Sequence, residues 1–303
     1  MSQNNLPEPF RTPGSDPSFK DKFCLFLGIV TLFPLRLIVG VPPFLLMWLN
    51  AKLGLIGMDE TQPSKGYRKG LQSINLLIIK FISKFCFGFF SPSINGKLLP
   101  AKEAPIIIVA PHSSMFDGLV VSWLGSINSM CSVIVREEEK NGIFLGTIMR
   151  FHQMVFVKRS NKASKDSTVE TIGKRAQNGA DWGRLIIFPE GTTSNGTSLL
   201  PFRRGSFMPG SHSIQPVIIR YVNNGVDCTT WTLGNKGLRG FLWTVVKAMS
   251  TLNNKVELSI LPSVKPHGDP LVFGEWVRKY MGEISGLPLY DEDNKIVDKI
   301  FSR

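Results

Sequence analysis

Six short runs of aliphatic and β-branched residues in the last two thirds of the chain constrain its fold more than any other feature. Several are continuously apolar rather than alternating, which is typical of strands that are buried on both faces of a sheet. Amphipathic segments separate them. This alternation predicts an α/β fold, in which a mixed, mostly parallel sheet is flanked by helices. The predicted strands cover residues 104–110, 131–136, 153–159, 184–190, 214–221 and 256–261.

The N-terminal part of the chain has a different texture. Residues 1–22 are polar and rich in proline, and we expect a disordered arm there without a cleaved signal peptide. Residues 23–50 are apolar and long enough to cross a bilayer, but Pro34 and Arg36 interrupt them. We therefore expect two short helices, split at Pro34–Arg36, that enter and leave one leaflet. A single tilted transmembrane helix and a soluble helix pair are the alternatives.

Three further segments have helical character. Residues 71–90 place Lys80 and Lys84 on one helix face, which fits either a lipid headgroup layer or a half-buried core helix. Ser167 and Glu170 predict a capping box at the start of another helix. Residues 238–252 have the clearest amphipathic spacing, for which we favour core packing over membrane contact.

The predicted organisation follows from these segments. A membrane-associated helical region covers residues 23–94, a catalytic domain covers residues 95–290, and a short tail covers residues 291–303.

Charge and cysteine content narrow the class of protein. The net charge of +12 favours polyanionic partners such as phosphate-bearing substrates, an anionic membrane or nucleic acid. The basic residues do not gather into one patch with interleaved aromatic residues, so we expect no nucleic-acid partner. The four cysteines are far apart and form no C-x-x-C pair, which predicts reduced thiols and neither a disulfide framework nor a zinc site.

The sequence PHSSMFDG directly follows the predicted strand 104–110 and contains His112 and Asp117. Two helical residues five positions apart point in different directions. The two side chains meet only if His112 lies in the strand-to-helix turn and Asp117 in the first turn of the helix. A carboxylate on one ring nitrogen would then orient the histidine and leave the other nitrogen to take a proton. A helix-capping aspartate is the structural alternative.

Two other segments carry groups suited to an anion. The predicted strand 184–190 ends in Glu190, Gly191 and Thr192, and glycine, hydroxyls and backbone N–H groups after a strand make a plausible anion cradle. Arg203 and Arg204 follow, with guanidinium groups suited to phosphate. Arg159 ends the strand in VFVKRS. Solvated loops and strand ends are the alternatives for both segments.

The order of these blocks along the chain is specific. HSSMFD, VFVKRS, FPEGTTSNGTSLLPFRRGSFMPG and IQPVIIRY resemble the four blocks of the glycerolipid acyltransferase superfamily over roughly residues 95–265. Within it they look most like lysophosphatidylcholine acyltransferases. The glycerol-3-phosphate and lysophosphatidic acid enzymes are similar but less close.

The resemblance implies a role for each matching residue. His112 would be the general base and Asp117 its orienting partner. Glu190, Gly191 and Thr192 would help to bind the acceptor. The other matching residues would be Arg159 near the acceptor phosphate, Arg203 in place of the lysine of relatives, and Pro216 lining the acyl or acceptor channel. Acyl-CoA would be a co-substrate, and no cofactor, metal or partner protein is implied.

The resemblance also implies an endoplasmic reticulum membrane protein whose catalytic domain faces the cytosol. The sequon at Asn195 would then stay unmodified. Acyl transfer to lysophosphatidic acid or glycerol-3-phosphate is the alternative within the class. A catalytically silent lipid-binding protein is the alternative outside it.

Overall fold

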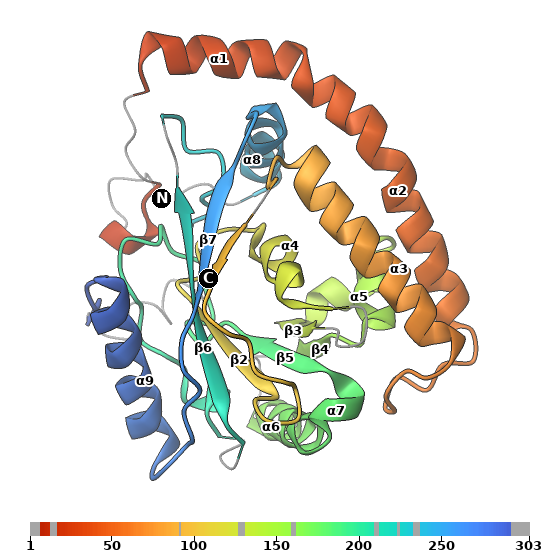
Figure 1. The fold of residues 1–303 in the computed structure, drawn as a ribbon, viewed down its shortest axis with the longest axis vertical. Coiled ribbons are helices and arrows are strands. Elements are labelled where there is room, and N and C mark those ends of the chain that lie inside the picture. Colours follow the sequence, from red (N-terminus) through yellow and green to blue (C-terminus); the bar gives the residue numbers. More distant parts are fainter. Residues whose placement is uncertain are drawn as a thin grey trace.

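The computed structural model describes residues 7–12, 17–90, 92–126, 131–158, 162–208, 212–222, 225–232 and 237–291. Its centre is a seven-stranded sheet in the order β1-β7-β6-β2-β5-β3-β4 (Figure 1). All neighbouring pairs are parallel except β6 with β7. The predicted fold class is therefore confirmed. The strands are β1 (Ser93–Asn95), β2 (Ile106–Ala110), β3 (Cys131–Arg136), β4 (Val155–Val157), β5 (Arg184–Ile187), β6 (Ile214–Val222) and β7 (Lys255–Ile260).

Both faces of the sheet are covered, which explains why its strands are continuously apolar. On β2, Ile106 and Ile108 face a cluster that includes side chains of α6 and α9. Ile107 and Val109 point the opposite way, into a cluster with side chains of α4 and α8. The helices are α1 (Phe19–Val30), α2 (Leu32–Leu55), α3 (Tyr67–Phe81), α4 (Asp117–Val121), α5 (Leu145–Phe151), α6 (Lys162–Gln177), α7 (Gly179–Trp182), α8 (Leu238–Ser250) and α9 (Pro270–Ser285).

Helices α1 and α2 form a bent arch along the outside of the molecule (Figure 1). One side of α2 packs through Met47 and Ala51 against Ile78 of α3 and Phe151 of α5. The rest of α2 is largely exposed, and only 11% of its most apolar window is buried. Helix α2 is long and apolar enough to cross a membrane. The core helix of a soluble protein or a signal sequence can have the same length and composition.

The predicted split at Pro34–Arg36 is wrong. The break between α1 and α2 lies at Thr31, and Pro34 falls in the first turn of α2, where its missing N–H is not needed. The guanidinium of Arg36 is buried and donates to the carbonyl oxygens of Met249, Thr251 and Leu252. Arg36 therefore stabilises the C-terminal end of α8, where free carbonyls favour a cation.

Part of the arm that we expected to be disordered is structured. Glu8–Phe10 form a 3-10 turn in which Phe10 is completely buried, with its ring edge-on to Tyr290 at 6.5 Å between centroids. The carbonyl of Pro9 accepts a hydrogen bond from the backbone N–H of Asn195. A buried aromatic ring and a backbone hydrogen bond thus hold this segment against the rest of the fold.

Two helices differ from their predicted form. The capping box at Ser167 is wrong, because α6 begins at Lys162 and Ser167 lies inside it. The helix predicted over residues 71–90 consists of α3 and a π-helical turn, Ile82–Cys86. Lys80 of α3 donates to the carbonyl of Gly125, 2.8 Å away, so its ammonium group contacts the domain. Of the predicted tail, residues 292–303 lie outside the described residues.

Candidate active site

His112 and Asp117 meet just beyond the carboxyl end of β2. The strand ends at Ala110, His112 lies in the turn that follows, and Asp117 is the first residue of α4. The His112 Nδ1 atom is 2.6 Å from Asp117 Oδ2. This arrangement is the one that the five-residue spacing required. A strand-to-helix turn at the open end of a mostly parallel sheet is a common location for a functional site.

Four donors surround the carboxylate of Asp117, which is fully buried. Oδ2 accepts from the backbone N–H groups of Ser113 (3.1 Å) and Ser114 (3.2 Å) as well as facing His112. Oδ1 accepts from the hydroxyl of Tyr221 at 2.6 Å. Because the carboxylate acts as an acceptor throughout, Nδ1 of His112 is assigned the ring hydrogen. In the neutral ring Nε2 is then an acceptor.

The imidazole of His112 is held flat and partly open to solvent. It stacks on Phe188 with 4.2 Å between ring centroids and 23° between planes, and 24% of its side chain is exposed. Within the described residues, no hydrogen bond is made to Nε2. The ring is therefore oriented through Nδ1 while Nε2 is available to a reacting hydroxyl group.

Glu190 holds the turn that contains His112 through a hydrogen bond to its backbone. Its Oε2 accepts from the backbone N–H of His112 (2.8 Å), and its Oε1 accepts from the N–H of Leu200 (2.9 Å). Burial raises the pKa of Glu190 to about 8, while the two N–H donors and the nearby Arg278 act in the opposite direction. Both carboxylate oxygens contact backbone amides, so this geometry gives Glu190 a positioning role. Its predicted contact with the acceptor stays a prediction.

Gly191, Thr192 and Arg203 lie together in the loop after β5. Gly191 has a φ of +67°, which favours glycine, and a Cβ there would be 3.4 Å from Arg203 Cγ, so the arginine side chain packs beside this residue. Thr192 is buried. The N–H of Arg203 donates to the carbonyl of Pro189, which fixes the arginine backbone next to the loop. Their predicted roles in binding the acceptor stay predictions.

One predicted site residue that the structure describes is not part of this cluster. Pro216 is buried within the sheet, where it pairs with Ile108 of β2. His112 lies in the turn beyond the end of β2, outside this paired region. Its place in a channel is a prediction that this position does not test. Arg159 lies outside the described residues.

Tyr221 is the functional residue that sequence reasoning missed. Burial and the charge of Asp117 raise the pKa of the Tyr221 hydroxyl well above its usual range, so it remains a donor. It lies near the end of β6 on the same face as Val217 and Ile219. Its position in the predicted strand 214–221 could have placed it at the end of the sheet that carries His112. Only the structure could place its hydroxyl on Asp117.

The segment before α8 is hydrogen-bonded to the His112 turn. The hydroxyl of Ser114 donates to the carbonyl of Thr229 (2.6 Å), and the N–H of Trp231 donates to the carbonyl of Ser113 (2.9 Å). In the described part of the chain, no cluster of three or more histidine, cysteine, aspartate or glutamate side chains could hold a metal ion. The chemistry that this arrangement offers is proton transfer at His112.

The segment that carries this site is similar to known acyltransferases. Residues 93–220 match the model of the acyltransferase family. The matched segment includes β2, the His112 turn and the Glu190 loop.

Individual proteins that the chain resembles have more specific names than the family model. It is 36% identical over 268 residues to lysophosphatidylcholine acyltransferase 1 of Danio rerio, which covers 86% of this chain and 50% of the relative. It is 34% identical over 293 residues to the human protein of the same name, covering 92% and 53%. The chain spans about half the length of these relatives. The crystal structure of the 1-acyl-sn-glycerophosphate acyltransferase PlsC from Thermotoga maritima has a TM-score of 0.48 and 20% identity, covering 84% of this chain and all of that one.

Proposed function

We propose that this protein is a membrane-associated acyltransferase. It transfers a fatty acyl group from acyl-CoA to the free hydroxyl of a lysophospholipid, with lysophosphatidylcholine or a close relative as the acceptor. The observation that carries the proposal is the buried Asp117 that orients His112 through Nδ1 at 2.6 Å. The names of the relatives support the choice of a lysophospholipid acceptor.

The reaction follows from the exposed nitrogen of His112. Nε2 takes the proton of the acceptor hydroxyl as its oxygen attacks the thioester carbonyl of acyl-CoA. The resulting tetrahedral intermediate collapses with cleavage of the C–S bond, and CoA leaves as the thiolate. The imidazolium returns its proton to that thiolate, which leaves an ester and free CoA. Asp117 stabilises the imidazolium while it exists.

The surroundings of His112 fit a phosphate-bearing acceptor. Arg203 packs beside Gly191 on the loop whose Glu190 holds the His112 backbone, and we propose that its guanidinium binds the acceptor phosphate together with Arg159. The net charge of +12 favours both anionic substrates and an anionic leaflet.

The membrane location is also part of the proposal. We place the protein on the endoplasmic reticulum membrane with its catalytic domain toward the cytosol, where α1 and α2 would contact lipid. The side-chain amide of Asn195 donates to the backbone carbonyl and the carboxylate of Glu8, an engagement that fits an unmodified sequon. A glycan on Asn195 in protein isolated from cells would contradict this orientation.

The test is an acyl-transfer assay on membranes that contain the protein. It supplies labelled acyl-CoA and a panel of lysophosphatidylcholine, -ethanolamine, -glycerol and -serine, with lysophosphatidic acid and glycerol-3-phosphate. Transfer to a lysophospholipid that His112→Ala abolishes is the expected result. Transfer only to lysophosphatidic acid or glycerol-3-phosphate would reassign the acceptor. No transfer by well-folded protein would favour a silent lipid-binding protein.

A further inference from the structure

The first two turns of α8 project from the domain with apolar side chains on several sides. Leu238 is 75% exposed, Leu242 is 52% exposed and Trp243 is 50% exposed, and Phe241 is also exposed. The helix becomes buried from Thr244 onward, where it packs on the sheet. An exposed apolar patch of this kind in a folded domain marks a surface that contacts another apolar phase.

This projecting part of α8 is coupled to the candidate active site. Phe241 contacts Trp231 edge to face, with 6.2 Å between ring centroids. The N–H of Trp231 in turn donates to the carbonyl of Ser113, the residue after His112. Two contacts, from Phe241 to Trp231 and from Trp231 to Ser113, therefore connect the start of α8 to the His112 turn.

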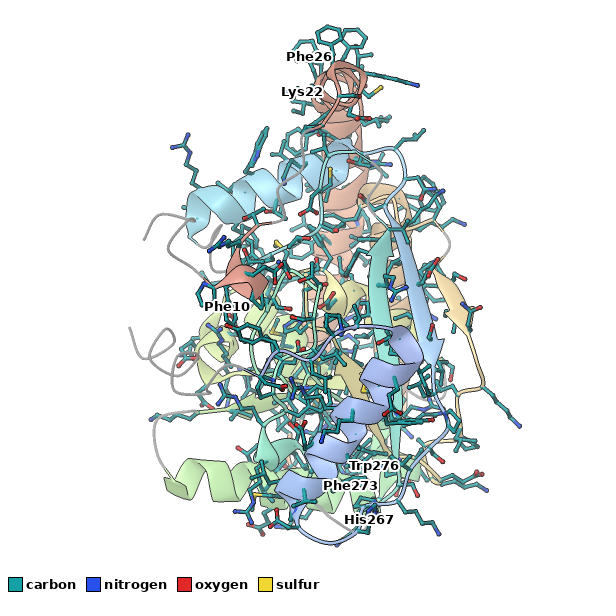
Figure 2. All side chains as sticks on the ribbon, turned by 90° about the vertical axis from the view of Figure 1, so that its left-hand side faces the viewer. Phe10, Lys22, Phe26, His267, Phe273 and Trp276 are labelled. Atoms are coloured by element: carbon teal, nitrogen blue, oxygen red, sulfur yellow. The ribbon has the colours of Figure 1, made fainter. Side chains whose placement is uncertain are left out.

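The other end of α8 packs against α1, which also exposes apolar side chains. Gly28 lies so close to α8 that a Cβ there would be 2.0 Å from the carbonyl oxygen of Ser250. On its outer side α1 exposes Phe23, Phe26 and Val30. Figure 2 shows α8 close to α1, which carries Lys22 and Phe26, at one end of the molecule, while Trp276 of α9 lies at the other.

The composition of this surface fits a lipid bilayer better than a protein. Trp243 is a side chain that favours the boundary between headgroups and acyl chains, and Phe241 suits the apolar face of a helix that lies there. Arg239 on α8 and Lys20 and Lys22 on α1 are exposed and suit anionic headgroups. A second copy of this chain would bring another net charge of +12 against the first, which opposes self-association through this face.

We propose that the first turns of α8 and the outer side of α1 together dock into the headgroup layer of an anionic phospholipid bilayer. The rim of the site beside His112 then meets the lipid surface, and an acceptor can enter by lateral diffusion. This proposal rests on the proposed function, since it assumes an acceptor held in the membrane.

The experiment places a fluorescent label at a single cysteine of the full-length protein in vesicles of phosphatidylcholine and phosphatidylserine. Cys24 is exposed and Cys131 is partly buried, so both are first replaced, by serine and alanine respectively, while Cys86 and Cys228 are buried and remain unlabelled. Leu242→Cys places the label on α8, and Val272→Cys places it on α9, where the side chain is 69% exposed. Lipids with a spin label near the headgroup should quench the label at position 242 and leave the label at position 272 unaffected.

Activity gives the second readout. Leu242→Asp should lower transfer to an acceptor held in vesicles by about tenfold relative to transfer to a short-chain monomeric acceptor, because it removes apolar groups that insert into lipid. Val272→Asp, on the opposite end of the molecule, is the matched control and should leave this ratio unchanged.

Two outcomes would overturn the proposal. One is an unquenched label at position 242 in vesicles where a label at Phe26→Cys is quenched. The other is energy transfer between labels at position 242 on two copies of the protein, which would assign this face to self-association. Quenching needs no catalysis, so a failure of the proposed function would leave the docking test intact.

Discussion

Replacing Tyr221 by phenylalanine removes a side-chain hydrogen bond to the carboxylate that orients His112. The Tyr221 hydroxyl is 2.6 Å from Asp117 Oδ1, and Asp117 is fully buried. A hydrogen bond to a charged group contributes about 1.5–3 kcal/mol. If that contribution stabilises the dyad in the transition state, kcat falls by about 10- to 100-fold, since about 1.4 kcal/mol is tenfold in rate. The KM values of both substrates should change little.

A double-mutant cycle tests whether Tyr221 acts through Asp117. The kcat of acyl transfer is measured for Tyr221→Phe, for Asp117→Asn and for the double variant. Tyr221→Phe should cost much less in the Asp117→Asn background than in the wild type. Tyr280→Phe, on α9, removes a hydroxyl from a partly buried ring and is the control. An equal loss in both backgrounds, or a wild-type rate in Tyr221→Phe, would refute the reasoning.

Substitutions at three other sites, with their controls, test the stability of the supporting structure. Burial raises the pKa of Glu190 to about 8, so the contribution of its protonated form to the free energy of unfolding is fully present below about pH 4.5 and is lost as pH rises through 8. In the wild type the free energy of urea unfolding should therefore fall by up to about 4 kcal/mol between those pH values. Glu190→Gln should remove this fall. Gly28→Ala should cost about 1–3 kcal/mol in thermal unfolding because its Cβ meets the backbone of Ser250, whereas Gly70→Ala, where a Cβ meets nothing within 4 Å, should stabilise α3. Arg36→Met leaves three carbonyls at the end of α8 without their donor and should cost about 3 kcal/mol, with Arg36→Lys intermediate. Equal melting temperatures for the two alanine variants, a pH dependence that survives Glu190→Gln, or an unchanged melting temperature in Arg36→Met would contradict these expectations.

Most of the sheet could be predicted from the sequence because its strands are buried on both faces. A run such as Ile106–Ala110 is apolar at every position, which is a strong local signal. The edge strand β1 has three exposed residues and carries no such signal, because it is defined by its pairing with β7. The antiparallel direction of β7 is likewise a property of the assembled sheet and is not encoded in its own residues.

The helix boundaries were harder to predict, because tertiary contacts decided them. Proline and arginine at positions 34 and 36 are local signals against a continuous helix, and both misled. Pro34 is harmless in a first turn, and Arg36 has carbonyl partners more than 200 positions away in the sequence. Phe10 similarly belongs to a polar segment, and that segment is ordered by tertiary contacts, namely the burial of Phe10 and the hydrogen bonds from Asn195 to Pro9 and Glu8.

The site itself was predictable in part. The spacing of His112 and Asp117 gave a geometric condition, and the structure meets it. The hydrogen bond from Tyr221 to Asp117 joins residues 104 positions apart, and the one from the His112 amide to Glu190 joins residues 78 positions apart. Such contacts depend on which strands are neighbours, and strand order cannot be read from the pattern of single strands.

The most direct test of the central claim is the turnover of His112→Ala. The variant is purified beside the wild type and shown by its melting temperature and circular dichroism to be folded, and acyl transfer from acyl-CoA to lysophosphatidylcholine is then measured. Loss of a general base predicts a fall in kcat of about a hundredfold to ten-thousandfold. Turnover at the wild-type rate by the folded variant would contradict the assignment of His112 as the base.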